Sequence, residues 1–162
     1  MNKRMKTACF TGHRNIPVSE ISIIKNRLKS VIASLIEKGV IYYGNGAAYG
    51  FDLIAAETVL EMKQKYPQIF LILVLPCRNQ TEKWQDEREI KRYYDILDKA
   101  DKVVYLSELH YKGCELARNR HLVDNSGYCI CYLTQNSGGT AYTVDYAKSK
   151  KLKIYNIVED II

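Results

Sequence analysis

The sequence lacks the features that mark membrane proteins, secreted proteins and proteins stabilised by disulfides. Its longest apolar run, residues 69–75, is far too short to span a bilayer. The basic N-terminus lacks the longer apolar segment of a signal peptide. The five cysteines form no Cys-x-x-Cys pair, and Cys129 and Cys131 would share one face of a strand, which favours packing over a local disulfide. We therefore expect a cytoplasmic protein with structural thiols and no membrane partner.

No linker, low-complexity segment or internal boundary divides the 162 residues, so we expect one domain, 1–162. A hydrophobic content of 47% and a charged content of 26% are typical of globular proteins. The net charge is +6, but no run of basic residues stands out. This charge suits an anionic small molecule better than nucleic acid. The sequence leaves open whether the chain forms a homo-oligomer.

Apolar runs and helical periods alternate along the whole chain. Strands are expected at 6–11, 40–43, 69–75, 102–106, 128–133 and 152–158. Helices are expected between them, the first capped by Ser19, and the others at 51–65, 81–99, 114–125 and 139–149. The apolar run 69–75 predicts a strand covered on both faces.

This alternation predicts an α/β fold of the Rossmann-like, three-layer α/β/α type, with a mainly parallel sheet of about six strands. Right-handed crossovers place the carboxyl ends of all strands at one edge of the sheet. Ligands in such folds bind at that edge, near the switch in strand order, where strand one usually lies. The residues just after each strand are therefore the candidates for a site.

The loop after the first strand contains Gly12, His13 and Arg14. Gly12 allows a tight turn, and the next two side chains then project near the sheet edge. The guanidinium of Arg14 can grip a phosphate or a carboxylate with paired N–H donors, although it could also be an ordinary surface arginine.

The loop after the second strand contains Gly44, Gly46 and Gly50, followed by Asp52. The glycines suit close approach of the backbone to a ligand, but their spacing is not that of the dinucleotide fingerprint. Asp52 could cap the helix, accept hydrogen bonds from a ribose or serve as a catalytic carboxylate.

The strongest signal follows the fifth strand, where Gly138, Gly139 and Thr140 lead into a helix. A strand that turns through glycines into a helix presents unpaired N–H groups and the positive end of the helix dipole, which suits a phosphate. Asp145 lies two turns into this helix.

Other residues are weaker indications of a functional site. Arg118 and Asn119 form a polar pair on the preceding helix and are expected to bind the ligand or its phosphate, and Trp84 could stack on a base or simply pack. No metal-ligand spacing links the three histidines, so we expect no metal site. No nucleophile-elbow pattern accompanies the serines or cysteines.

Together these segments resemble the SLOG superfamily, the Rossmann-like group that includes the SMF/DprA DNA-processing proteins and the LOG phosphoribohydrolases. Within it the chain looks most like the YpsA-type (DUF1273/DUF2493) bacterial proteins. The segments that carry the resemblance lie at residues 11–14, 44–52, 75–77, 118–124 and 137–140.

The resemblance implies a nucleotide-type ligand such as ADP-ribose, NAD or a nucleoside monophosphate, bound across the carboxyl edge. Gly12 and Arg14 match the first motif of the superfamily, Gly46, Gly50 and Asp52 the second, and residues 138–140 the third. The LOG pattern Pro-Gly-Gly-x-Gly-Thr-x-x-Glu is not kept here, because Ser137, Ala141, Tyr142 and Asp145 replace four of its residues.

Three functions follow as hypotheses. The first is a nucleotide-binding or sensing protein without turnover, which the three anion-suited turns and the lack of a catalytic set favour. The second is an enzyme of the phosphoribohydrolase type that cleaves an N-glycosidic bond, with Asp52 or Asp145 stabilising the developing positive charge. The third is a DprA-like module that binds single-stranded nucleic acid.

Overall fold

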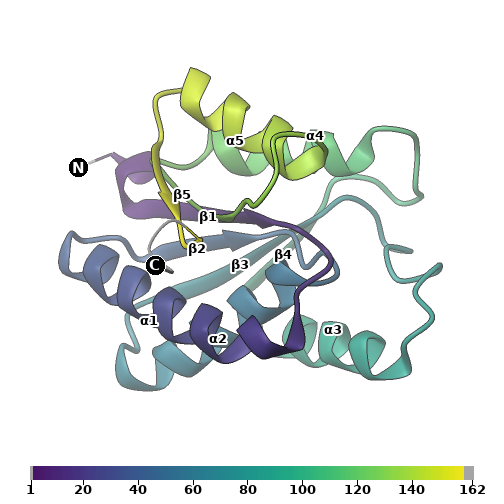
Figure 1. Cartoon of the computed structure of the whole chain (residues 1–162), viewed down its shortest axis with the longest axis horizontal. Coiled ribbons are helices and arrows are strands. Elements are labelled where there is room, and N and C mark those ends of the chain that lie inside the picture. Colours follow the sequence, from purple (N-terminus) through teal and green to yellow (C-terminus); the bar gives the residue numbers. More distant parts are fainter. Residues whose placement is uncertain (1, 159–162) are drawn as a thin grey trace.

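The computed structural model describes residues 2–158 and contains one sheet of six parallel strands (Figure 1). Their order across the sheet is β4-β3-β2-β1-β5-β6. The strands are β1 (Thr7–Gly12), β2 (Tyr42–Asn45), β3 (Phe70–Leu75), β4 (Lys102–Tyr105), β5 (Tyr128–Tyr132) and β6 (Lys153–Asn156). The order reverses at β1, which pairs with β2 on one side and β5 on the other. The predicted fold class and the predicted switch at the first strand are confirmed.

Helices cover both faces of the sheet. On one face lie α1 (Ile21–Glu37), α2 (Phe51–Lys65) and α3 (Glu87–Lys99), and on the other lie α4 (Cys114–Asp124) and α5 (Gly139–Ser149) (Figure 1). Two short 3-10 helices, Lys3–Lys6 and Val18–Glu20, precede β1 and α1. Among the helices of residues 2–158, none has the length and apolarity that crossing a bilayer requires.

The main core lies between the sheet and the three-helix face. On α1 the spacing of apolar residues buries Ile24, Leu28, Ile32 and Leu35 along one side. On α2 nearly every residue of the first two turns is buried, because this helix lies between its two neighbours as well as on the sheet. The position of α2 therefore fixes the loop that precedes it, residues 46–50.

Two local predictions were wrong. The α1 helix is entered through a 3-10 turn, so its N-cap is Glu20 without a side-chain bond, and Ser19 does not cap it. The α3 helix begins at Glu87 rather than near residue 81, because Asp86 accepts a hydrogen bond from the N–H of Arg88 at 2.9 Å and starts the helix there. Residues 81–83 instead form a turn, and residues 84–86 lie outside regular secondary structure. Trp84 packs edge-to-face against Tyr93.

The strand β3 is also less covered than its apolar sequence predicts. Phe70 is 38% exposed and Ile72 is half-buried. They point toward the two-helix face, where the aromatic ring of Phe70 stacks on Tyr42 of the neighbouring strand. With only α4 and α5 on that face, the part of the sheet over β2–β4 stays partly open.

Candidate functional site at the carboxyl edge

His13 ties together the loops that follow β1, β2 and β5. Its N–H donates to the carbonyl oxygen of Tyr132 at 3.3 Å, and its own carbonyl accepts from the N–H of Phe51 at 3.2 Å. The ring atom Nε2 accepts a hydrogen bond from the N–H of Thr134 at 2.9 Å. Three loops that are far apart in sequence therefore meet at one residue.

The hydrogen bond from Thr134 fixes the tautomer of this imidazole. A ring nitrogen that accepts an N–H bond cannot carry a proton, so the proton of the neutral ring is on Nδ1. Partial burial lowers the pKa of His13, which also favours the neutral form. His13 thus serves as a neutral connector between loops, a role that the sequence did not predict.

At two of the predicted glycines, neighbouring loops approach so closely that no side chain would fit. A Cβ at Gly50 would lie 2.2 Å from the carbonyl oxygen of Arg14, and its φ of +91° is one that other residues rarely adopt. A Cβ at Gly12 would lie 2.4 Å from the ring of Phe51. The first and second loops are therefore packed backbone against backbone, and Arg14 is held at this junction with its side chain exposed.

A buried polar cluster lies under the second loop. Arg118, on α4, is 2% exposed, and its Nη1 donates to the carbonyl oxygen of Gly46 at 2.6 Å. A Cβ at Gly46 would lie 2.4 Å from the same nitrogen, so the glycine is needed for this approach. The side-chain amide of Gln80 donates to the carbonyl oxygens of Gly46 and Ala47 at 3.1 and 3.2 Å.

Asp52 lies in this cluster at the start of α2 and is 5% exposed. Its Oδ2 accepts from the N–H of Ala48 at 3.3 Å, whereas Oδ1 is buried and has no hydrogen-bond partner among residues 2–158. Desolvation by burial raises the pKa of Asp52 to about 6, although Arg118 and the N–H of Ala48 act in the opposite direction. A buried acceptor without a partner is rare in proteins, so Oδ1 is suited to receive a hydrogen bond from a ligand.

The third loop is open to solvent. Gly138, with φ +95°, is the N-cap of α5 and offers no side-chain cap, and both it and Gly139 are exposed. A Cβ at Gly138 would meet no atom within 4 Å. Unlike Gly12, Gly46 and Gly50, these glycines therefore keep a helix N-terminus accessible, and that arrangement suits an anion.

The remaining predicted residues have different surroundings. Thr140 is buried in the first turn of α5, and Gly44 lies inside β2 against Leu122. Asn119 donates to the hydroxyl of Thr143 at 3.0 Å and so joins α4 to α5. Asp145 is on the exposed side of α5, whereas Asp52 is buried, so the two proposed carboxylates occupy unlike environments.

A family model described as the YspA SLOG family matches residues 8–159. The chain belongs to that family. A UPF0398 protein of Halalkalibacterium halodurans is 34% identical over 134 residues, which cover 81% of this chain and 70% of the relative. A UPF0398 protein of Brevibacillus brevis is 31% identical over 157 residues, which cover 93% of this chain and 83% of the relative. The resemblance to the SLOG superfamily is confirmed.

Solved structures show the same fold. DNA processing protein A from Helicobacter pylori superposes with a TM-score of 0.68 at 18% identity, covering 98% of this chain and 72% of that chain. DNA processing protein A from Streptococcus pneumoniae superposes with a TM-score of 0.65 at 15% identity, covering 91% of this chain and 48% of that chain. At such low identity the likeness shows the fold alone.

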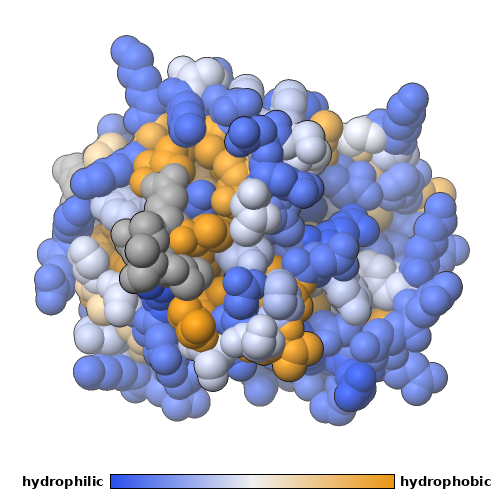
Figure 2. Space-filling model, viewed as in Figure 1, coloured by the Kyte–Doolittle hydropathy of each residue, from blue (hydrophilic) through white to orange (hydrophobic). Residues whose placement is uncertain are grey.

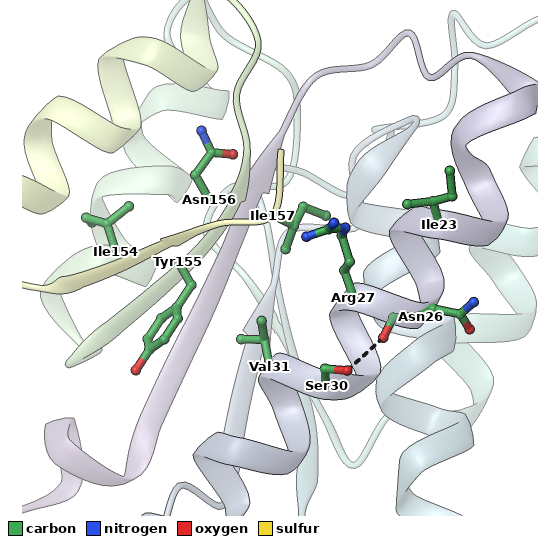
Figure 3. Close-up of a pocket in the computed structure, with 9 residues that line it drawn as sticks. All are labelled: Ile23, Asn26, Arg27, Ser30, Val31, Ile154, Tyr155, Asn156 and Ile157. Atoms are coloured by element: carbon green, nitrogen blue, oxygen red, sulfur yellow. Dashed lines mark hydrogen bonds between the residues drawn. The ribbon is translucent and has the colours of Figure 1, made fainter. Parts of the chain in front are cut away.

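Two grooves help to locate the site of this SLOG protein. One, of about 570 Å³, adjoins the first and second loops and is lined by Arg14, Tyr49 and Gly50, with Arg88 and Arg92 from α3. The other, of about 530 Å³, lies between α1 and β6 and contains none of the predicted site residues (Figure 3). The groove beside Arg14 extends the carboxyl edge toward Arg88 and Arg92, but these two arginines already form ion pairs, Arg88 with Asp86 and Arg92 with Glu57 and Glu89.

A further group at this edge escaped the sequence analysis. The side chains of His110, Cys114 and Glu115 bring their nitrogen, sulfur and oxygen atoms within 4.8 Å of one another. The expectation that no metal site exists rested on the spacing of histidines alone. A search for mixed His, Cys and Glu donors around residues 110–115 would have found the group.

Proposed function

We propose that this SLOG protein binds a nucleotide-type ligand across the carboxyl ends of β1, β2 and β5, without turning it over. ADP-ribose, NAD and nucleoside monophosphates are the candidate ligands. The exposed and uncapped start of α5 at Gly138 and Gly139 carries the proposal, because it offers backbone N–H donors and a positive dipole end to a phosphate. His13 supports it by holding this turn against the other two loops.

The other loops supply what the rest of a nucleotide needs. The exposed guanidinium of Arg14 adds a charged donor for a phosphate or carboxylate. The partnerless Oδ1 of Asp52 is an acceptor for a hydroxyl, such as one of a ribose. The groove beside Arg14 has about 570 Å³, within the range of small-molecule sites.

Isothermal titration calorimetry with ADP-ribose, NAD and AMP tests this proposal. We expect one ligand to bind with 1:1 stoichiometry, and Arg14→Ala to weaken it by about 10- to 100-fold through loss of a charge-assisted hydrogen bond. Arg27→Ala is the matched control, because Arg27 lines the groove between α1 and β6 and should leave affinity unchanged. The absence of binding for all three ligands, or equal loss in both variants, would remove the proposal.

A second candidate is cleavage of an N-glycosidic bond, and the pKa of Asp52 favours it. A carboxyl group with a pKa near 6 can hold or release a proton near neutral pH, which general acid–base chemistry needs. Chromatography for free base after incubation with nucleoside monophosphates or NAD measures this activity. Cleavage that persisted in both Asp52→Asn and Asp145→Asn would exclude the chemistry proposed for these residues.

A third candidate is binding of single-stranded DNA. The similar structure from Helicobacter pylori is described by its single-stranded DNA binding mode, and this chain carries a net charge of +6. Binding of this kind loses affinity steeply as salt increases. Fluorescence anisotropy with a labelled oligonucleotide at increasing salt decides it, since an absence of salt-sensitive binding excludes the DNA-binding candidate.

A further inference from the structure

We propose that His110, Cys114 and Glu115 form a binding site for a divalent cation of the zinc type. This site is separate from the nucleotide site proposed above and does not depend on it. Among residues 2–158 these three side chains are the one group of His, Cys, Asp or Glu donors that lies within 4.8 Å. They come from the loop after β4 and from the first turn of α4.

The distances between the donor atoms suit tetrahedral coordination. His110 Nε2 lies 3.1 Å from Glu115 Oε1, and Cys114 Sγ lies 3.4 Å from Glu115 Oε2. Zinc bonds to nitrogen, oxygen and sulfur place tetrahedral ligands about 3.3–3.8 Å apart. His110 is exposed and can turn about its side-chain bonds, so the set can close around a cation without moving the backbone.

The backbone that carries these residues is already fixed. The N–H of His110 donates to Oδ1 of Asn79 at 3.1 Å, which attaches its loop to the one after β3. The N–H of Cys114 donates to the carbonyl oxygen of Tyr111 at 3.1 Å, and Gly113 makes the turn with φ +90°. Preorganised ligands of this kind reduce the ordering that binding requires.

A second buried thiol adjoins the group. Cys77, just after β3, is 1% exposed, and its thiol is hydrogen-bonded to that of Cys114, which is also 1% exposed. Cys77 is not one of the donors that lie within 4.8 Å of one another, so a water molecule, rather than this thiol, would complete four-coordination.

The chemistry of the donors selects the type of cation. Thiolate and imidazole ligands favour zinc and similar transition metals over magnesium or calcium, which prefer oxygen. One thiolate and one carboxylate carry two negative charges, which a divalent cation balances. An exposed His–Glu ion pair contributes little to stability by itself, so the pair alone does not account for the gathering of these three donors.

Titration with Co²⁺, a spectroscopic stand-in for zinc, tests the site in the 162-residue chain. We expect one equivalent to bind and to produce the absorption band of a thiolate-to-cobalt charge transfer, and Zn²⁺ to displace it. Cys114→Ser should abolish the band, and His110→Ala should weaken Co²⁺ binding at least tenfold. Cys129→Ser and His121→Ala are controls, because Cys129 is buried inside β5 and His121 lies near the end of α4.

The proposal is overturned if the wild-type protein shows no charge-transfer band, or if the band persists unchanged in Cys114→Ser or His110→Ala. It is also overturned if Cys129→Ser and His121→Ala lose binding to the same extent. His110→Ala decides the matter if Cys114→Ser folds poorly, since the side chain of His110 is 51% exposed and its removal leaves the core intact. Arg14→Ala should bind Co²⁺ normally, which separates this site from the nucleotide site.

Discussion

Arg118 donates a 2.6 Å hydrogen bond to the carbonyl oxygen of Gly46, which lies 72 residues earlier in the chain. This contact joins α4, on one face of the sheet, to the loop that begins α2, on the other face. The guanidinium is 2% exposed and is flanked by the amide of Asn119, whose Oδ1 accepts from Nε at 2.7 Å. The loop at residues 46–50 therefore depends on a residue that sequence reasoning assigned to a ligand.

Substitution of Gly46 tests this dependence. A methyl group there would lie 2.4 Å from Nη1 of Arg118, so Gly46→Ala must displace the guanidinium or the loop. We expect a loss of about 1–3 kcal/mol in the free energy of unfolding, as for overpacking elsewhere. Urea denaturation measures it. Unchanged stability in Gly46→Ala would contradict the close contact between the two residues.

Removal of Arg118 should have a larger effect. Arg118→Met removes the shorter of two hydrogen bonds to the carbonyl of Gly46, the other coming from Gln80, and leaves Oδ1 of Asn119 without its donor. We expect a cost of about 2–4 kcal/mol in the free energy of unfolding. Arg120→Met, two residues along α4, is the matched control, because Arg120 donates a long, exposed hydrogen bond of 3.4 Å to the hydroxyl of Tyr142. Equal effects in the two variants would show that burial of Arg118 is energetically unimportant.

Asp52 should make stability depend on pH in an unusual direction. Burial raises its pKa to about 6, so between about pH 4 and 6 the native state holds a proton that the unfolded chain has lost. The extra proton stabilises the native state, and this stabilising contribution is complete below about pH 4 and is lost as the pH rises through 6. The stabilising contribution of the protonated carboxyl group of Asp52 amounts to about 3 kcal/mol.

The comparison with Asp52→Asn isolates this contribution, because asparagine does not titrate. We expect the free energy of unfolding of the wild-type protein, minus that of the variant, to fall by about 3 kcal/mol between pH 4 and pH 7. Chemical denaturation at several pH values gives the two curves. Curves that run parallel over this range would mean that the carboxyl group of Asp52 has an ordinary pKa.

The sequence predicted the elements of the fold well because their signals are local. The bounds of α2 and α5 were predicted as they are found, since apolar periodicity and flanking glycines define both helices. The start of α3 was placed too early, because the charged stretch before Asp86 is compatible with a helix and only the capping bond shows where the helix begins.

The site could be predicted only in part, because its main contacts join distant segments. The motif residues were correctly placed at the carboxyl edge, yet the spaces beside Gly12, Gly46 and Gly50 are filled by protein atoms rather than left for a ligand. No local sequence pattern predicts the hydrogen bond from Arg118 to the carbonyl of Gly46, or the one from the N–H of Thr134 to the ring of His13. Such contacts depend on the order of strands in the sheet.

The two glycines before α5 should differ in their tolerance of a side chain. Gly138 has φ +95° and ψ −175°, a conformation that is nearly exclusive to glycine, so Gly138→Ala should cost about 1–3 kcal/mol although its methyl would meet no atom. A methyl at Gly139 would make an ordinary 3.9 Å contact with Leu116, so Gly139→Ala should change stability by less than about 0.5 kcal/mol. Thermal unfolding of both variants checks the contrast. Equal stability would contradict the backbone conformation at Gly138.

His13 should make the contact between the loops after β1, β2 and β5 sensitive to acid. Burial lowers its pKa, and the native state needs Nε2 unprotonated to accept from the N–H of Thr134. The stabilising contribution is therefore present above the ordinary histidine pKa of about 6.5 and is lost as the pH falls through the lower native value. His13→Gln is the informative variant, because an amide oxygen can accept the same bond without titrating.

We expect the free energy of unfolding of the wild-type protein, relative to His13→Gln, to decrease as the pH is lowered from 7.5 to 5. In the wild-type protein the amide NMR signal of Thr134 should move over the same range, because protonation of His13 breaks the bond that this amide donates. His121→Gln should leave the titration of that signal unchanged, since His121 lies on α4 and is not a partner of Thr134. A Thr134 signal that stays fixed while the ring of His13 titrates would show that the imidazole does not hold the turn before α5, and the nucleotide site would then lose the contact that joins its third loop to the other two.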